Sequence, residues 1–260
     1  GSPGLISAAQ VENLRAILRP GDILIERRNW FLSNAFLPGF WPHSALYTGG
    51  AEGLRELGID GDARVAKHIE ELEAPDSHGE QLVVIEAMSE GVVFTSLEHS
   101  IGEADAVCVL RPNLPRDEIA EAVAKALSHH GKPYDFDFDF FSNDRLVCTE
   151  VVYQAYEDLI DFELVEIMGR RTLPAVEIVR KWEQERGRPD AELKLIAFYD
   201  MDEEYGVARA AGPETLRETL HRTSVAFLQT QEGAPAFLGP GFYLLIAVFL
   251  AGLLVMRPRR

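Results

Sequence analysis

One of the two cysteines in the chain occupies a position that favours a reactive thiol. Cys148 begins a segment in which Val151, Val152 and Ala155 follow at helical spacing. The Ser-Asn-Asp run at 142–144 can cap the start of such a helix. Unpaired backbone N–H groups and the positive end of the helix dipole favour a thiolate there, and they can also stabilise an oxyanion on a substrate carbonyl. Cys148 is therefore a candidate nucleophile, and a buried, unreactive thiol is the alternative.

A thiolate nucleophile needs a base, and the base needs a group that orients it. Among the seven histidines, His43 follows Trp41-Pro42 and directly precedes an expected strand at 44–48, so a rigid strand end would hold its ring. Glu86 interrupts the apolar run at 83–87, where a carboxylate needs a partner because an unpaired buried charge is costly. An ordinary strand-edge histidine and an exposed edge glutamate are the alternatives.

The other histidines lie at positions that favour a solvated or helix-capping role: His68, His78, His99, His129, His130 and His221. His129 and His130 end an expected helix, where the dipole favours a cation. The others lie in charged, turn-like or linker segments and are expected to be solvated. Cys108 lies between two valines of an expected strand, and we expect it to be buried and unreactive.

The acidic stretch YDFDFDFF at 134–141 offers aspartates at positions 1, 3 and 5 of a calcium-binding loop that starts at Asp135. The glycine required at position 6 is Phe140, and the glutamate required at position 12 is Leu146. The alternating phenylalanines favour an extended, half-buried segment with the aspartates on its other face. Two cysteines are also too few for a zinc site built mainly from thiolates. We expect no metal and no cofactor, with calcium as the alternative.

Composition limits the classes of partner. The 260 residues include 42 acidic and 25 basic side chains, which give a net charge of −17. A chain this acidic lacks the basic surface that binds phosphate backbones, so nucleic acid is excluded as a partner. Hydrophobic residues make up 47% of the chain, enough for a sizeable core.

Periodicity and turn residues predict one α+β domain over 1–200 that positions these side chains. The expected helices span 7–19, 117–130, 144–159 and 174–184, and the expected strands span 22–26, 44–48, 81–87, 91–97, 104–110 and 193–199. The three strands between 81 and 110 are expected to form an antiparallel meander. The charged segment 51–80 is expected to be a surface insertion, partly helical around 66–72.

The end of the chain predicts a membrane anchor over 237–260, joined to the domain by a polar linker over 201–236. Residues 242–256 read FYLLIAVFLAGLLVM without a charged residue, and Arg257, Arg259 and Arg260 follow. With the residues before it the apolar segment reaches about 20 residues, near the length that spans a bilayer. A buried tail and a dimerisation helix are the alternatives. The arginines favour a cytoplasmic end, which would place the domain outside a bacterial cell membrane or in the periplasm.

Five motifs in this order resemble the permuted papain-like amidases of the YaeF/YiiX kind, over about residues 20–200. These proteins are relatives of NlpC-type cysteine peptidases and of lecithin–retinol acyltransferase-like proteins. The motifs are Gly21-Asp22-Ile-Leu-Ile, Trp41-Pro42-His43-Ser-Ala-Leu-Tyr, Ile85-Glu86-Ala87, Lys132-Pro-Tyr134-Asp135 and Val147-Cys148-Thr-Glu150-Val-Val. The histidine precedes the cysteine, as the permutation demands. The resemblance implies a small antiparallel, barrel-like sheet packed against helices.

The resemblance also implies roles for particular residues. Cys148 would be the nucleophile, His43 the base and Glu86 the orienting residue. Tyr134, Asp135 and Glu150 match family positions that shape the site.

A further substrate contact is expected outside these matched positions. Trp41 belongs to an aromatic stretch at 30–41 that suits an apolar substrate wall, a membrane contact or a plain core.

These residues predict a cysteine hydrolase that cleaves an amide or ester through an acyl-enzyme on Cys148. A peptide of the cell envelope and a lipid-linked molecule are the two expected substrate classes. A thiol-dependent acyltransferase or lipase is the first alternative. A non-catalytic, membrane-tethered binding module is the second.

Overall fold

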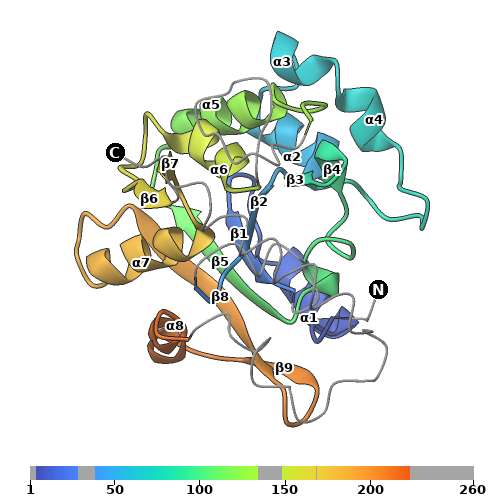
Figure 1. Ribbon diagram of the computed structural model, residues 1–260. Coiled ribbons are helices and arrows are strands. Elements are labelled where there is room, and N and C mark those ends of the chain that lie inside the picture. The colour runs from blue at the N-terminus through green and yellow to red at the C-terminus, as the bar shows by residue number, and fades with distance from the viewer. Residues whose placement is uncertain (1–3, 29–38, 134–147, 168, 223–260) are drawn as a thin grey trace, which may run out of the picture. The chain divides into compact units, whose positions relative to one another are not determined.

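The computed structural model describes residues 4–28, 39–133, 148–167 and 169–222 (Figure 1). The helices are α1 Ala8–Arg15, α2 Gly50–Leu57, α3 Ala63–Ala66, α4 Ile69–Glu73, the 3-10 helix η2 Ile101–Glu103, α5 Arg116–Leu127, α6 Cys148–Tyr156, α7 Ala175–Glu185 and α8 Pro213–Thr219. The strands are β1 Ile23–Arg27, β2 His43–Tyr47, β3 Val84–Met88, β4 Gly91–Thr95, β5 Ala106–Pro112, β6 Val165–Ile167, β7 Arg170–Thr172, β8 Leu193–Asp202 and β9 Val207–Ala210. The acidic stretch, most of the aromatic stretch and the predicted anchor lie outside the described residues.

Seven strands form one antiparallel sheet in the order β4-β3-β2-β1-β5-β8-β9, and β6 pairs with β7 in a separate hairpin (Figure 1). The register pairs Glu26 of β1 with His43 of β2, and Leu46 of β2 with Ile85 of β3. The mixed α+β architecture with an antiparallel sheet agrees with the predicted fold class. The three strands β1, β2 and β3 lie side by side, so residues from all three can meet on one face of the sheet.

The sheet buries a hydrophobic cluster on each face because successive side chains of a strand point to opposite sides. Ile23 and Ile25 of β1 belong to the larger cluster, which contains side chains of α5, α6 and α7. Leu24, between them in sequence, belongs to the smaller cluster with Leu14 of α1. Helix α6 packs against β2 and β3, which brings its first residue close to the start of β2.

Helix α1 begins as the sequence predicts. Ser7 caps it, since the Ser7 side chain accepts from the Gln10 backbone and the Gln10 side chain accepts from the Ser7 backbone at 2.8 Å. This reciprocal pair is a capping box. The helix ends at Arg15, earlier than the periodicity predicts, because Ala16 already forms its C-cap.

The predicted meander of three strands holds only for its first two members. Strands β3 and β4 form a hairpin, but β5 pairs with β1 and β8. The chain between β4 and β5 carries η2, and Leu97 and Ile101 in it are fully buried in the smaller cluster. Burial of these side chains takes the connection across the sheet, so β5 joins the far side of β1.

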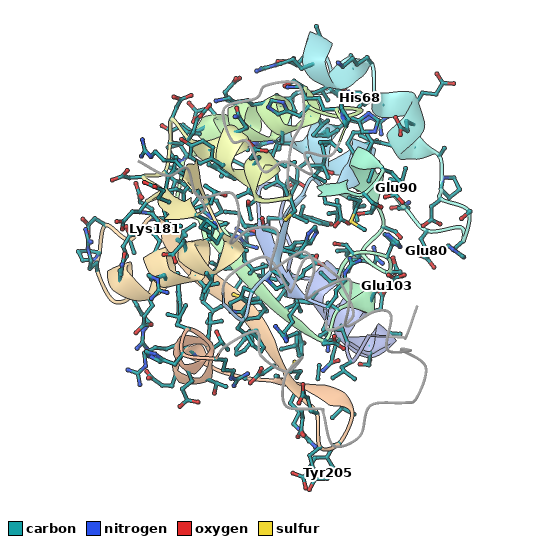
Figure 2. All side chains as sticks on the ribbon, viewed as in Figure 1. His68, Glu80, Glu90, Glu103, Lys181 and Tyr205 are labelled. Carbon is teal, nitrogen blue, oxygen red and sulfur yellow. The ribbon has the colours of Figure 1, made fainter. Side chains whose placement is uncertain are left out.

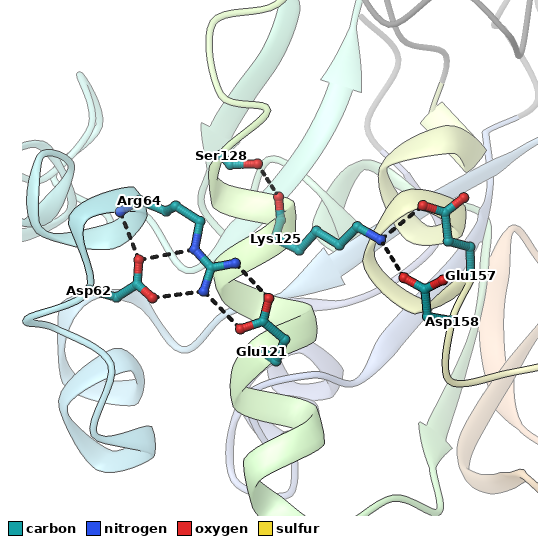
Figure 3. Close-up of polar contacts among 7 residues, drawn as sticks. All are labelled: Asp62, Arg64, Glu121, Lys125, Ser128, Glu157 and Asp158. Carbon is teal, nitrogen blue, oxygen red and sulfur yellow. Dashed lines mark hydrogen bonds and ion pairs between the residues drawn. The ribbon is translucent and has the colours of Figure 1, made fainter.

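The segment 51–80 is not a surface insertion alone. It forms α2, α3 and α4, and its side chains Leu54, Val65 and Leu72 are buried in the larger cluster. Arg64 of α3 also contacts Glu121 of α5 through two hydrogen bonds of 2.6 and 2.8 Å (Figure 3). The charge-rich sequence hides this packing because only a few positions per turn face the core.

Residues 201–222, predicted as the start of a linker, instead complete the folded domain. β8 continues to Asp202, β9 pairs with it, and α8 packs against β8 with Leu216 fully buried. Tyr205, in the turn between β8 and β9, is 65% exposed and projects from the rest of the fold (Figure 2). The polar composition of this segment reflects an edge strand with solvent-exposed side chains rather than an extended linker.

No helix within the described ranges is long and apolar enough to cross a membrane. The predicted anchor at 237–260 falls beyond them.

Candidate active site

His43 and Glu86 form a close polar pair on neighbouring strands. His43 is the first residue of β2, and its side chain is 16% exposed. Glu86 lies in the middle of β3 and is completely buried. The Nε2 atom of His43 and the Oε2 atom of Glu86 are 2.6 Å apart. The partner expected for a buried glutamate is therefore the histidine at the strand end.

The second oxygen of Glu86 is also occupied. The Thr95 hydroxyl, on the adjacent strand β4, donates to Glu86 Oε1. Burial acts to raise the pKa of Glu86, but hydrogen bonding to His43, the charges of His43 and Arg28, and the Thr95 bond lower it to about 2. Glu86 is thus an ionised carboxylate with both oxygens in use, which fixes the orientation of the imidazole.

Cys148 lies beside His43, although it comes from a distant part of the sequence. It is the first residue of α6, is 4% exposed, and its Sγ lies 3.7 Å from the carbonyl oxygen of Pro42, the residue before His43. The sequence folds this way because Val151 and Val152 bury the inner face of α6 in the larger cluster. The thiol therefore lies at a helix start, beside the strand end that holds His43.

The imidazole interacts with both neighbours. Burial acts to lower the pKa of His43, but the charge of Cys148, a hydrogen bond to Cys148, and the bond and charge of Glu86 raise it to about 10. Because Nε2 faces Glu86, Nδ1 is the ring nitrogen left for Cys148. The raised pKa of His43 favours an imidazolium between the Cys148 sulfur and the Glu86 carboxylate. A cation beside the sulfur is what nucleophilic catalysis by cysteine requires.

Two charged residues that the sequence analysis did not select lie behind this pair. Glu26 is completely buried, and it accepts from the Ser100 hydroxyl at 2.6 Å and from Arg28 Nη2 at 3.3 Å. Arg28 also donates to the carbonyl of Ser100 at 2.8 Å, and its charge lowers the pKa of Glu86. The signal in the sequence was the run Glu26-Arg27-Arg28 directly after an apolar strand, where charges need partners.

Glu26, His43 and Glu86 also offer three ligand atoms within 4.8 Å of one another, which is close enough for a shared metal ion. Each carboxylate is already engaged, Glu26 with Arg28 and Ser100 and Glu86 with His43 and Thr95. A metal cation here would also be repelled by the positive charge of Arg28. The donor set fits an orienting network better than a metal site.

The predicted substrate-binding residues have different outcomes. Trp41 is fully buried, packs edge-on against Phe40 and Phe198, and donates from Nε1 to Thr219 Oγ1 at 2.8 Å. It is a core residue rather than a substrate wall, because its polar atom is satisfied inside the domain. Glu150 is completely buried in the first turn of α6.

Tyr134 and Asp135 lie outside the described residues. Among the other candidates, Cys108 is fully buried in β5, and burial raises the pKa of its thiol, as expected of an unreactive cysteine.

Two histidines are buried although one was expected to be solvated and the other to cap a helix. His68 is 8% exposed rather than solvated. His129 is 9% exposed, and neither of its ring nitrogens has a hydrogen-bond partner in the described part of the chain, so it does not cap α5. Burial lowers the pKa of His129 to about 4, with smaller contributions from Lys132 and Lys125.

Comparison with known proteins identifies the family of the chain. The model of the permuted papain-like amidase enzymes, YaeF/YiiX, C92 family, matches residues 17–208. None of the curated proteins matches the chain. A solved structure described as the metalloprotein yiiX from Escherichia coli O157:H7 is similar at 20% identity and a TM-score of 0.43, over 70% of this chain and 97% of that one. Because the family match covers well over half of its length, the chain belongs to the permuted papain-like amidases of the YaeF/YiiX, C92 family.

Proposed function

We propose that the protein is a cysteine amidase that works through an acyl-enzyme on Cys148. The family implies a papain-like cysteine amidase or peptidase. The observation that carries the assignment of residues is the position of His43, which interacts with Cys148 and lies 2.6 Å from the Glu86 carboxylate. Nucleophile, base and orienting group therefore meet in the order that the chemistry needs.

In the proposed mechanism the Cys148 thiolate attacks the carbonyl carbon of an amide. The backbone N–H of Cys148, at the start of α6, donates to the oxyanion that forms. The His43 imidazolium then gives its proton to the leaving amine, and the C–N bond breaks. A water molecule next attacks the thioester, and neutral His43 accepts the water proton. The C–S bond breaks, releasing a carboxylic acid and restoring the ion pair.

Glu86 has a positioning role in this cycle. Its charge stabilises the imidazolium, and its bond to Nε2 keeps Nδ1 directed at the thiol. Arg28 keeps Glu86 ionised, and Thr95 prevents the carboxylate from rotating. Each of these groups acts through His43 and needs no contact with substrate.

The proposed substrate is an amide in a cell-envelope peptide or a lipid-linked molecule. The family name supports the amide bond. The apolar segment at 242–256 supports a place at the membrane, with 237–260 as the anchor and the domain outside the cytoplasm. Assays with peptidoglycan fragments and with lipid esters or thioesters separate the two classes. Release of free acid marks a hydrolase, and transfer to an added amine or alcohol marks an acyltransferase.

The test compares Cys148→Ala with Cys108→Ala in the full chain. Cys148→Ala is expected to abolish turnover and labelling by a thiol-directed acyl probe. Cys108→Ala is the matched control, because it removes the only other thiol from a fully buried strand position. Turnover that survives in Cys148→Ala would overturn the proposal. A folded, unreactive wild-type thiol would instead favour a binding module.

A further inference from the structure

A second group of ionisable side chains lies between the segment 51–80 and the end of α5. His68 is the residue before α4, Glu71 lies in the first turn of α4, and His130 follows α5. One ligand atom from each, two imidazole nitrogens and a carboxylate oxygen, lies within 4.8 Å of the other two. Figure 2 shows His68 at the start of α4. The group shares no residue with the candidate active site.

His68 has a buried ring nitrogen that makes no hydrogen bond within the described residues. The residue is 8% exposed, and its Nε2 is buried without a hydrogen-bond partner in the part of the chain that the structure describes. A neutral imidazole nitrogen that makes no hydrogen bond can offer its lone pair to a metal ion.

Phe94 of β4 holds both imidazole rings in place. Its ring stacks on His130 with centroids 4.2 Å apart and planes at 8°, and it contacts His68 edge-on at 5.4 Å. The two imidazoles are themselves 4.8 Å apart between centroids. Phe94 lies on the face of β4 opposite Thr95, the residue that contacts Glu86. The two imidazoles therefore pack on the face of β4 opposite the one that contacts Glu86.

Glu71 completes the group on its outer side. Its side chain is 48% exposed, and its Oε1 lies 3.4 Å from His130 Nε2. Two ligands of a tetrahedral zinc ion are about 3.3 Å apart, given metal–ligand bonds of about 2.0–2.1 Å. The ligand atoms of Glu71 and His130 already have this spacing. A small movement of the His68 ring would therefore let all three residues bind the same ion. The exposed carboxylate leaves a path for an ion and for water.

We propose that His68 Nε2, His130 Nε2 and the Glu71 carboxylate bind one zinc ion, with water as the fourth ligand. Imidazole and carboxylate are ligands that suit zinc, and the net charge of −17 favours cations near the surface. The bound ion links α4 to the chain that follows α5. Without an ion, the Glu71–His130 pair can form, but Nε2 of His68 finds no partner among the described residues, at the cost of a buried polar atom left unsatisfied.

Zinc binding is measured by calorimetry on the full chain carrying Cys148→Ala, which removes the active-site thiol as a competing ligand. We expect one zinc ion per chain. In this background His68→Gln and Glu71→Gln should each weaken binding at least about tenfold. His99→Gln is the matched control, because His99 and Glu103 form an exposed pair at 3.3 Å that belongs to no three-ligand group among the described residues. It should leave the affinity unchanged.

A stability measurement covers the case in which His68→Gln fails to fold. Zinc should raise the thermal midpoint of the Cys148→Ala protein, because an ion that binds only the native state stabilises it. The rise should disappear in Glu71→Gln, whose half-exposed side chain is not needed for the core. Cobalt(II) should report a four-coordinate site by its visible absorption. Absence of binding, or an equal affinity and an equal rise in Glu71→Gln, overturns the proposal.

Discussion

The Nε2 atom of His43 lies 2.6 Å from Oε2 of Glu86, although the two residues are far apart in sequence and on different strands. Glu86 is fully buried, whereas the His43 side chain keeps 16% of its surface exposed. The buried Glu86 carboxylate thus contacts the His43 ring within the sheet. The ring meets the Cys148 thiol at the start of β2. This relationship determines how protonation, stability and turnover should respond to substitution.

Replacing Glu86 by glutamine should lower turnover strongly, although glutamine keeps the shape of the side chain. The amide carries no charge to stabilise the His43 imidazolium, so the pKa of His43 should fall. By analogy with other buried carboxylates that orient a catalytic histidine, kcat/KM should decrease by roughly 10³–10⁴-fold. The pH–rate profile of the variant reports the change in the pKa of His43 directly.

Glu90→Gln is the matched control for that experiment. Glu90 lies in the turn of the same β3–β4 hairpin, is exposed, and its carboxylate accepts from the Ser89 hydroxyl. Its substitution should leave kcat/KM within about twofold of wild type, since isolated surface changes are nearly neutral. Equal activity of Glu86→Gln and wild type would remove the positioning role of Glu86.

The His43–Glu86 pair should make stability depend on pH in a defined window. The pKa of His43 rises from 6.5 to about 10 on folding, so its contribution is complete below pH 6.5 and is lost as pH rises toward 10. The pKa of Glu86 falls from 4.5 to about 2, so its contribution is present above pH 4.5 and is lost as pH falls toward 2. Both contributions are complete between pH 4.5 and 6.5.

Urea denaturation as a function of pH measures this window. The difference in unfolding free energy between wild type and His43→Gln/Glu86→Gln should be largest from pH 4.5 to 6.5 and should shrink on both sides. Cys148→Ala should shift the alkaline loss to lower pH, because the charge of Cys148 helps to raise the pKa of His43. A pH-independent difference would contradict the assigned charge states.

Thr95→Val should test whether the hydroxyl holds Glu86 in place. Valine keeps the branched shape but leaves Glu86 Oε1 without its donor. Loss of a hydrogen bond to a buried charge should cost about 1.5–3 kcal/mol of unfolding free energy. Turnover should also decrease, because the carboxylate gains freedom to rotate. Thr95→Ser should restore both the stability and kcat, and failure of serine to do so would point to packing instead.

The local pattern of the sequence was enough to place the side chains of the candidate site on the right elements. Cys148 begins a helix, His43 begins a strand, and Glu86 lies inside one, because a helix start and a buried charge both leave short-range signatures. The contact between His43 and Glu86 depends on strand order and register. Those arise from packing of the whole sheet, and only the family resemblance pointed to that contact.

The failures have a common physical cause, which is burial by distant parts of the chain. His68 and Leu54 lie in charged surroundings, yet both are buried. Helix α5 packs against α2, which carries Leu54, and Phe94 of β4 packs against His68. For Trp41 the sequence left a substrate wall, a membrane contact and a plain core open, and its hydrogen-bond partner Thr219 comes from a segment expected to be a linker. Short windows of sequence carry no information about such partners.

Two substitutions in the segment 51–80 should separate core packing from surface charge. Leu54→Ala removes a fully buried side chain from the larger cluster, and it should cost about 2–5 kcal/mol of unfolding free energy. Arg64→Ala removes the contacts to Asp62 and Glu121 (Figure 3), but the Arg64 side chain is 36% exposed, so the cost should stay below about 1 kcal/mol. Urea denaturation of both variants measures the difference. If Leu54→Ala were as stable as Arg64→Ala, the segment would be an accessory on the surface, and α2 would not belong to the core that supports α5 and α6.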